Sequence, residues 1–183
     1  MIIWIVIGVI ALILIYLVIS YNSFISMRNG VEEAFSTMDV YLKKRYDLIP
    51  NVVETVKGYA KHESETLENV IAARNSAMSA QSIDDKVAAQ GEIQQTLGRL
   101  FALSESYPDL KANTNFMELQ RQLGDIETEI AQSRKYYNGV VRAFNTKVEA
   151  FPSNIVAGLF KFTRKPLFEV DNVEERKNVK VEF

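Results

Sequence analysis

The sequence predicts an all-α protein in which a transmembrane helix is followed by an up-and-down antiparallel four-helix bundle. Residues 2–19 form a run without a charge, an Asn, a Gln or a Pro. From Tyr21 to Phe151 the apolar residues recur every three or four positions, a spacing typical of helices and not of strands. Pro50 and Pro108 are the only prolines in that region. These observations predict an anchor at residues 1–20, a bundle at 21–151, and an amphipathic segment with a C-terminal tail at 152–183.

The apolar run is long enough to cross a bilayer. At ~1.5 Å per residue it spans about 27 Å as a helix, close to the thickness of the hydrocarbon core. Trp4 and Tyr16 lie near its ends, where amphipathic rings favour the headgroup level. A cleaved signal peptide, with Val18 and Ser20 before the cleavage site, is the main alternative. A pilin-type filament subunit is another. Because neither a basic leader nor an early acidic residue is present, we expect a retained anchor.

The distribution of basic residues predicts the orientation of this anchor. No Lys or Arg precedes the apolar run, whereas Arg28 and the cluster at residues 43–45 follow it. Basic residues favour the cytoplasmic side of a membrane. We therefore expect the N-terminus outside and the body in the cytoplasm.

Composition limits the classes of function. The net charge is −2 with acids and bases interleaved, so no basic face for nucleic acid is expected. The absence of cysteine excludes disulfides, thiolate zinc sites and cysteine nucleophiles. His62 is the only histidine, which excludes a multi-histidine metal site. We expect no metal, no cofactor and no nucleic-acid partner.

Four helices are predicted in the bundle, at about residues 21–46, 49–80, 83–107 and 114–151. Asp47 is a good N-cap for the second helix, and Pro50 fits its first turn. The apolar spacing of the first helix also continues through Ile49 and Val52, which fits one long helix kinked at Pro50. We favour a turn before Pro50, because it produces four helices of similar length that can cover one another.

Local signals define the third and fourth helices. Ser82 can cap the third helix and Pro108 ends it, while the fourth begins near Asn113 or Thr114. The fourth helix has the most regular apolar stripe in the chain. That stripe predicts bundle core, with a coiled-coil oligomerisation seam as the alternative. Its members are Phe116, Leu119, Leu123, Ile126, Ile130, Ser133, Tyr137, Val140 and Phe144.

The segment after Pro152 combines an apolar helical face with basic residues. Ile155, Leu159 and Phe160 lie on that face and Lys161 follows it, a composition typical of a membrane-interface segment. The same residues would equally suit a cap on the end of the bundle core. The tail from residue 166 onward is expected to be poorly ordered or ordered by a partner.

Three charged residues on apolar stripes are candidates for a structural polar core. These are Glu63, Arg74 and Arg134. A charge on a core face has to be paired, so we expect interhelical salt bridges with partners from other helices, Arg134 and Arg28 being the candidates. A catalytic carboxylate at Glu63 is disfavoured, because the neighbouring His62 points about 100° away on a helix.

A polar face beside the core stripe of the fourth helix is a candidate docking surface. Asn138 and Asn145 are seven residues apart on that face, and Arg142 adjoins them. Another helix could dock there. A solvated face with local hydrogen bonds is the simpler interpretation.

Five strings in the chain carry a resemblance to a known family. They are Lys43-Lys-Arg-Tyr-Asp-Leu-Ile-Pro-Asn51, Val56-Lys-Gly-Tyr-Ala-Lys-His-Glu63, Arg134-Lys-Tyr-Tyr-Asn138, Phe151-Pro-Ser-Asn-Ile-Val-Ala-Gly-Leu-Phe160 and Val179-Lys-Val-Glu-Phe183. These strings resemble the LemA family, and the resemblance covers nearly the whole sequence. Phe35 departs from it, since the family more often has Trp there. The resemblance implies a single-span protein of the bacterial inner membrane with an up-and-down four-helix bundle, and it implies no reaction.

The sequence therefore predicts a non-enzymatic, membrane-anchored scaffold or interaction protein. Its expected partners are the lipid bilayer, further copies of itself and an unidentified protein. A membrane-shaping protein that uses residues 153–165 is one alternative, and an enzyme with Glu63 as a buried carboxylate is another.

Overall fold

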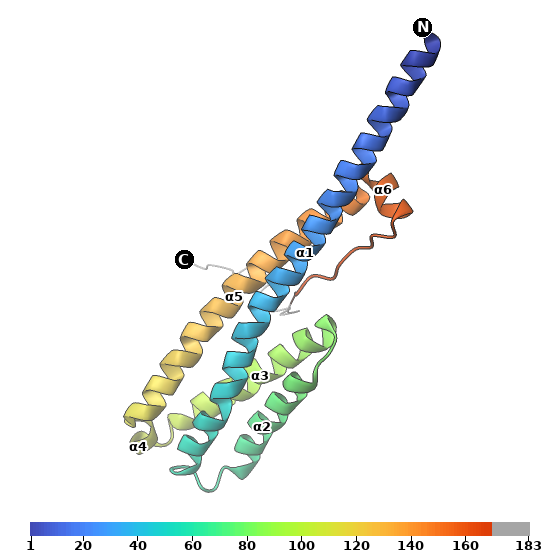
Figure 1. Ribbon diagram of the computed structural model, residues 1–183. Coiled ribbons are helices and arrows are strands. Elements are labelled where there is room, and N and C mark those ends of the chain that lie inside the picture. Colours follow the sequence, from blue (N-terminus) through green and yellow to red (C-terminus); the bar gives the residue numbers. More distant parts are fainter. Residues whose placement is uncertain (170–183) are drawn as a thin grey trace, which may run out of the picture. The chain divides into compact units, whose positions relative to one another are not determined.

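The computed structural model describes residues 1–169, and this part of the chain is helical without a strand (Figure 1). The predicted all-α class is confirmed. The predicted tail lies largely outside the described residues. The helices are α1 (Ile2–Lys57), α2 (Ser64–Ser79), α3 (Ile83–Ser104), α4 (Pro108–Lys111), α5 (Thr114–Glu149) and α6 (Ser153–Leu159).

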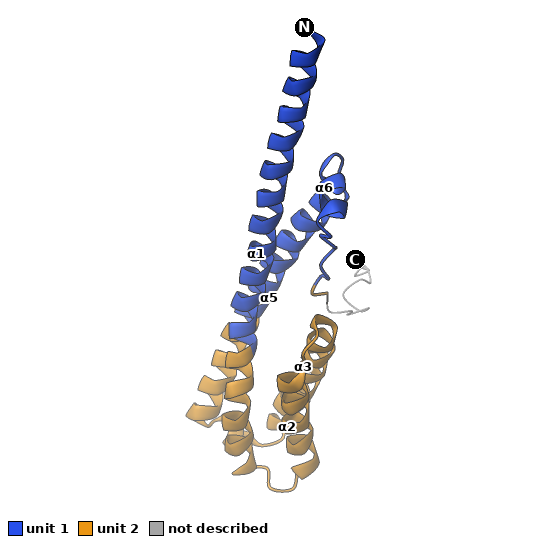
Figure 2. Cartoon of the chain, turned by 45° about the vertical axis from the view of Figure 1, so that its right-hand side comes forward, with its two compact units in different colours: residues 1–42, 128–167 blue, residues 43–127, 168–183 orange. Residues whose placement is uncertain are grey.

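The chain divides into two compact units, coloured separately in Figure 2. Unit 1 comprises residues 1–42 and 128–167, and unit 2 comprises residues 43–127 with the chain from residue 168. The long helices α1 and α5 contribute to both units. The bundle predicted at residues 21–151 stays a prediction.

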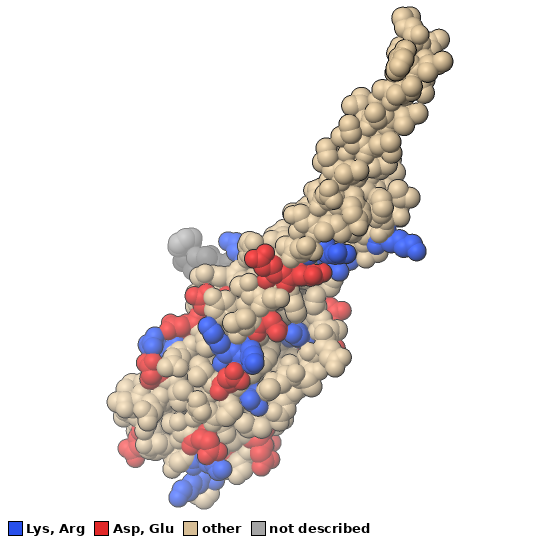
Figure 3. Space-filling model, viewed as in Figure 1, with Lys and Arg blue, Asp and Glu red and all other residues tan. Residues whose placement is uncertain are grey.

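The N-terminal part of α1 is the one described helix that is long and apolar enough to cross a membrane. Its apolar window has no residue buried inside the structure, which distinguishes it from the core helix of a soluble protein. Figure 3 shows this part of α1 without any Lys, Arg, Asp or Glu side chain. The apolar run of the sequence therefore forms a helix whose side chains are not buried by the other described residues.

Beyond the apolar run, α1 packs against α5 within unit 1. Phe24 is fully buried and meets Phe144 edge to face, with ring centroids 6.1 Å apart. Phe35 contacts Tyr137 in the same way at 5.8 Å. Such aromatic pairs stabilise a core beyond the area that they bury. The core stripe predicted for the fourth helix thus faces a core in the structure.

The predicted turn before Pro50 is wrong, because α1 continues through Pro50 to Lys57. The apolar spacing favoured this outcome, since Ile49, Val52 and Val56 are all fully buried. The chain turns instead at residues 58–63, where the Val56 carbonyl accepts from the N–H groups of Tyr59 and Ala60, both at 2.9 Å.

A side chain from α2 explains how α1 accommodates Pro50. A proline inside a helix has no N–H for the carbonyl four residues earlier, which here belongs to Tyr46. The Arg74 Nε donates a hydrogen bond to that carbonyl at 2.7 Å. A helix from elsewhere in unit 2 thus provides a donor where Pro50 cannot.

The remaining helix ends follow the local signals closely. Ser82 caps α3 by accepting from the Asp85 N–H at 3.0 Å, as predicted. Asn113 caps α5 by accepting from the Phe116 N–H at 2.9 Å. Pro108 begins the short helix α4, which the sequence did not predict, because a proline suits the first position of a helix.

The interaction between Arg74 and Tyr46 makes a prediction about coupling to Pro50. Arg74→Ala should destabilise the protein by about 1–3 kcal/mol, because a half-buried carbonyl loses its donor. Pro50→Ala restores an N–H four residues after Tyr46, so the cost of Arg74→Ala should fall by about 1 kcal/mol in that background. Urea unfolding of the four proteins, followed by circular dichroism, measures both costs. Equal costs in the two backgrounds would contradict this role.

Candidate functional site

The polar face predicted on the fourth helix binds the chain's own C-terminal segment. We call residues 161–167 the strap. The Asn145 side chain donates to the Lys165 carbonyl at 2.9 Å and accepts from the Lys165 N–H at 2.8 Å. The Tyr137 hydroxyl donates to the Pro166 carbonyl, also at 2.9 Å. Two side chains of α5 thus bind an extended segment of the same chain, and not a further helix, at this face.

The three residues predicted for this face have different environments. Asn145 is buried under the strap, with 6% of its surface exposed, and Asn138 is half-buried. Arg142 is exposed. Asn145 can pair with the strap because its side-chain amide has a donor and an acceptor side by side, which match the C=O and the N–H of one residue in an extended backbone.

Aromatic rings fasten the beginning of the strap to α1. The Phe162 ring stacks on Phe24, with centroids 4.7 Å apart and an angle of 15° between the planes. Tyr21 contacts Phe160 at 4.7 Å and Phe162 at 5.9 Å. The Lys147 ammonium lies 5.1 Å from the centre of the Phe24 ring. This cluster lies where α1 leaves its apolar run.

The helix α6 has a buried side and an exposed side, and the residues predicted for a membrane interface lie on the exposed side and at its end. Val156 and Ala157 are buried, as a cap on the core requires. Ile155, Leu159 and Phe160 remain exposed. Lys161 has a positive φ of 58°, and the next N–H bonds to the Ala157 carbonyl at 2.9 Å, which ends the helix in a Schellman turn. One side of α6 is therefore buried, as a cap on the core would be. The other side is exposed, and it contains the residues predicted for a membrane interface.

Unit 2 contains a buried polar group that the sequence analysis missed. Arg45 is only 3% exposed and forms an ion pair with Glu127. Beside it in the sequence, the Tyr46 hydroxyl accepts a hydrogen bond from Gln90, which is buried as well. The heptad spacing could have revealed Arg45, because it lies three residues after Leu42 and four before Ile49 on the core stripe.

The predicted polar core residues have partners other than those expected. Glu63 accepts a hydrogen bond from the Tyr107 hydroxyl at 3.2 Å, and Arg74 bonds to the Tyr46 carbonyl. Arg134 is half-buried and belongs to unit 1, whereas Glu63 and Arg74 belong to unit 2. Burial, together with the hydrogen bond and the charge of Glu63, raises the pKa of Tyr107.

A groove in unit 2 lies between α1 and α2 and does not include Glu63. It has a volume of about 770 Å³ and is lined by residues of α1, α2 and the turn between them, including Val53, Leu67 and Ile71. Glu63 is not among its lining residues. Within residues 1–169, no three His, Asp or Glu side chains come together as metal ligands. Glu63, the residue of the catalytic alternative, bonds to Tyr107 and does not line this groove.

The fold and these surfaces define a class of protein: an all-helical chain with one candidate membrane anchor and a body built of packed helices. The model of the LemA family matches residues 34–183. The chain belongs to the LemA family. This agrees with the strings from which the sequence analysis inferred the resemblance, and LemA proteins are membrane-associated.

Individual relatives support the same assignment. The chain is 26% identical over 155 residues to Protein LemA of Metamycoplasma hominis, covering 84% of this chain and 70% of that protein. It is 23% identical over 179 residues to Magnetosome protein MamQ 2 of Paramagnetospirillum magneticum, covering 84% and 66%. It is 22% identical over 178 residues to Magnetosome protein MamQ of Magnetospirillum gryphiswaldense, covering 83% and 65%. The chain thus spans about two thirds of the length of these relatives, and none of their names denotes an enzyme.

The strap makes a prediction that distinguishes Asn145 from Arg142, two residues of the predicted docking face. Asn145→Ala should speed backbone hydrogen exchange at residues 162–167, because the Lys165 peptide loses its paired side chain. Arg142→Ala is the matched control on the same helix, and it should leave the exchange unchanged because Arg142 is exposed. Mass spectrometry of exchanged peptides measures both. An Asn145→Ala strap as protected as the wild type would contradict the clamp.

The contact between Glu63 and Tyr107 makes a prediction about alkaline pH. Because the folded-state pKa of Tyr107 is raised, the protonated phenol contributes stability below its unfolded pKa of about 10. That contribution is lost as the pH rises through the folded pKa, so the wild type should lose more stability there than Tyr107→Phe. Near-ultraviolet absorbance should also show that Glu63→Gln lowers the pKa of Tyr107. An unchanged titration in Glu63→Gln would refute this account.

Proposed function

We propose that this chain is a non-catalytic, membrane-anchored interaction protein whose copies associate through the anchor. The observation that carries the proposal is the apolar window of α1, no residue of which is buried. Further along the same helix, Phe24 and Met38 are fully buried. An apolar helix without protein around it can be satisfied by lipid, by another helix, or by both.

Small residues in the anchor indicate where two copies would meet. Gly8 and Ala11 are three positions apart and lie on one face of the helix. A Cβ atom at Gly8 would meet nothing within 4 Å in this chain, so the position is open to a neighbour. Transmembrane helices associate through small residues that let their backbones approach closely. We therefore assign the contact to the face that contains Gly8, Ala11 and Ile15.

The proposed orientation is N-terminus outside and body in the cytoplasm of a bacterium. Arg28 and the basic residues at 43–45 follow the anchor, which supports this orientation through the preference of Lys and Arg for the cytoplasmic side. The body then presents its helices to cytoplasmic proteins. Its role in the proposal is to hold a protein partner at the membrane.

The absence of cysteine makes a direct test possible in the full-length chain. Ala11→Cys and Ile15→Cys should form disulfide-linked dimers in oxidised membranes, because they lie on the proposed contact face. Val9→Cys and Ile13→Cys are matched controls at a similar depth, since two residues along a helix correspond to about 200° of rotation. Non-reducing gels should show much more dimer for the first pair. Equal yields from both faces, or no dimer from any position, would overturn association through this face.

A further inference from the structure

One face of α6 is an exposed apolar surface of unit 1 outside the anchor. Ile155 and Leu159 are four residues apart on this helix and are 60% and 64% exposed. Phe151, just before α6, is 80% exposed. The opposite side of α6 contains the buried Val156 and Ala157. The helix is thus fastened to the unit on one side and left apolar on the other.

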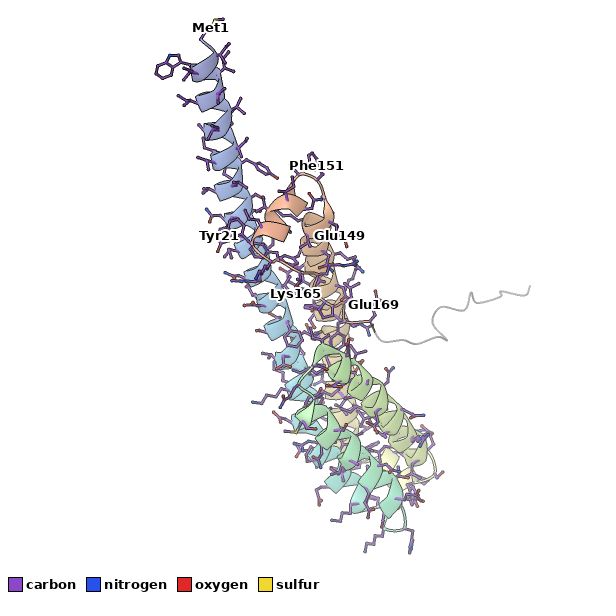
Figure 4. All side chains as sticks on the ribbon, turned by 90° about the vertical axis from the view of Figure 1, so that its right-hand side faces the viewer. Met1, Tyr21, Glu149, Phe151, Lys165 and Glu169 are labelled. Carbon is purple, nitrogen blue, oxygen red and sulfur yellow. The ribbon has the colours of Figure 1, made fainter. Side chains whose placement is uncertain are left out.

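A direct contact places the end of α6 beside the end of the membrane span. The Phe160 ring lies 4.7 Å from the Tyr21 ring, between centroids. Tyr21 comes two residues after the apolar run, where about 20 helical residues have crossed the hydrocarbon core. Figure 4 shows Phe151 at the turn before α6, on the side of the unit nearer the apolar part of α1. When the apolar run crosses the hydrocarbon core, this contact brings α6 to the bilayer surface.

Basic side chains follow the apolar face at the same place. Lys161 is exposed and directly follows Phe160. Arg164 is exposed as well and forms an ion pair with Glu149 at 2.9 Å. Figure 3 shows Lys and Arg side chains where the uncharged part of α1 ends. An apolar helical face edged by cations is typical of segments that lie in the headgroup region.

We propose that α6 lies in the membrane interface, with Phe151, Ile155 and Leu159 among the acyl chains and Lys161 at the lipid phosphates. The inference rests on the proposed anchoring and adds a second contact with the bilayer. Two contacts fix the rotation of α1 about its own axis as well as its depth. The anchor contact face proposed above is thereby presented in one direction in every copy.

Lipid is the occupant that the geometry favours over a second copy of the chain. The contact between Tyr21 and Phe160 holds α6 against α1 of the same molecule, so anchoring alone brings the face to lipid. A second copy would have to supply an apolar surface at the same depth. Outside the anchor, the next large exposed apolar residue of α1 in unit 1 after Tyr21 is Val40, about 28 Å further along the helix at ~1.5 Å per residue.

Tryptophan fluorescence in the full-length protein can test this directly. Trp4 is the only tryptophan, so Trp4→Phe provides a silent background. Leu159→Trp then reports on α6, and Val40→Trp is the matched control, since Val40 is 53% exposed in the same unit. Both proteins are reconstituted into vesicles of phosphatidylcholine and phosphatidylglycerol, with and without bromine atoms on the upper acyl chains.

Brominated lipid should quench the Leu159→Trp protein several-fold more than the Val40→Trp protein. Equal quenching would overturn the inference. A blue-shifted emission at position 159 without quenching would overturn it too, because protein and not lipid would then cover the face. Flotation of the vesicles separates the two proposals. A protein that floats but is not quenched at position 159 leaves the anchoring intact, whereas one that does not float refutes both.

Discussion

The continuity of α1 is the constraint on which the rest of the structure depends. One apolar stripe runs along this helix from Phe24 to Val56, and its phase is kept through Pro50. The helix therefore supplies a wall to unit 1 and to unit 2 in turn. Its first part carries no such stripe, because it is apolar on every side. A helix that is apolar all round is suited to lipid, and one with a single stripe to a water-facing body.

Side chains that supply missing hydrogen-bond partners recur in both units. Arg74 donates to the Tyr46 carbonyl at the proline of α1, and Asn145 pairs with both polar groups of the Lys165 peptide. Each interaction joins segments that are 20 or more residues apart. Backbone polar groups away from water have to be paired, so such side chains decide which irregular conformations a packed unit can contain.

The proposed function rests on surfaces and not on a cavity. The polar groups singled out in the sequence hold the body together: Asn145 holds the strap, and Glu63 bonds to Tyr107. Most of the exposed large apolar residues of unit 1 lie in the anchor and around α6. Apolar surface that the chain does not bury against itself indicates a site for a membrane or another protein.

The sequence by itself determined the features that depend on neighbouring residues. The all-α class follows from the spacing of apolar residues, the anchor from its uninterrupted length, and the caps at Ser82 and Asn113 from side chains that bond three residues along. Arg45 was also within reach of the sequence, since its place on the stripe is visible there. Only the tertiary structure decided the features that depend on distant residues. The helix α1 continues through Pro50 with Arg74, 28 residues after Tyr46, as the hydrogen-bond donor to the Tyr46 carbonyl. Asn145 is buried because the strap packs over it and Lys165 bonds to its side chain. The physical reason is that local spacing fixes which face of a helix is apolar, whereas the partner of a buried polar group is fixed only when the chain folds back on itself.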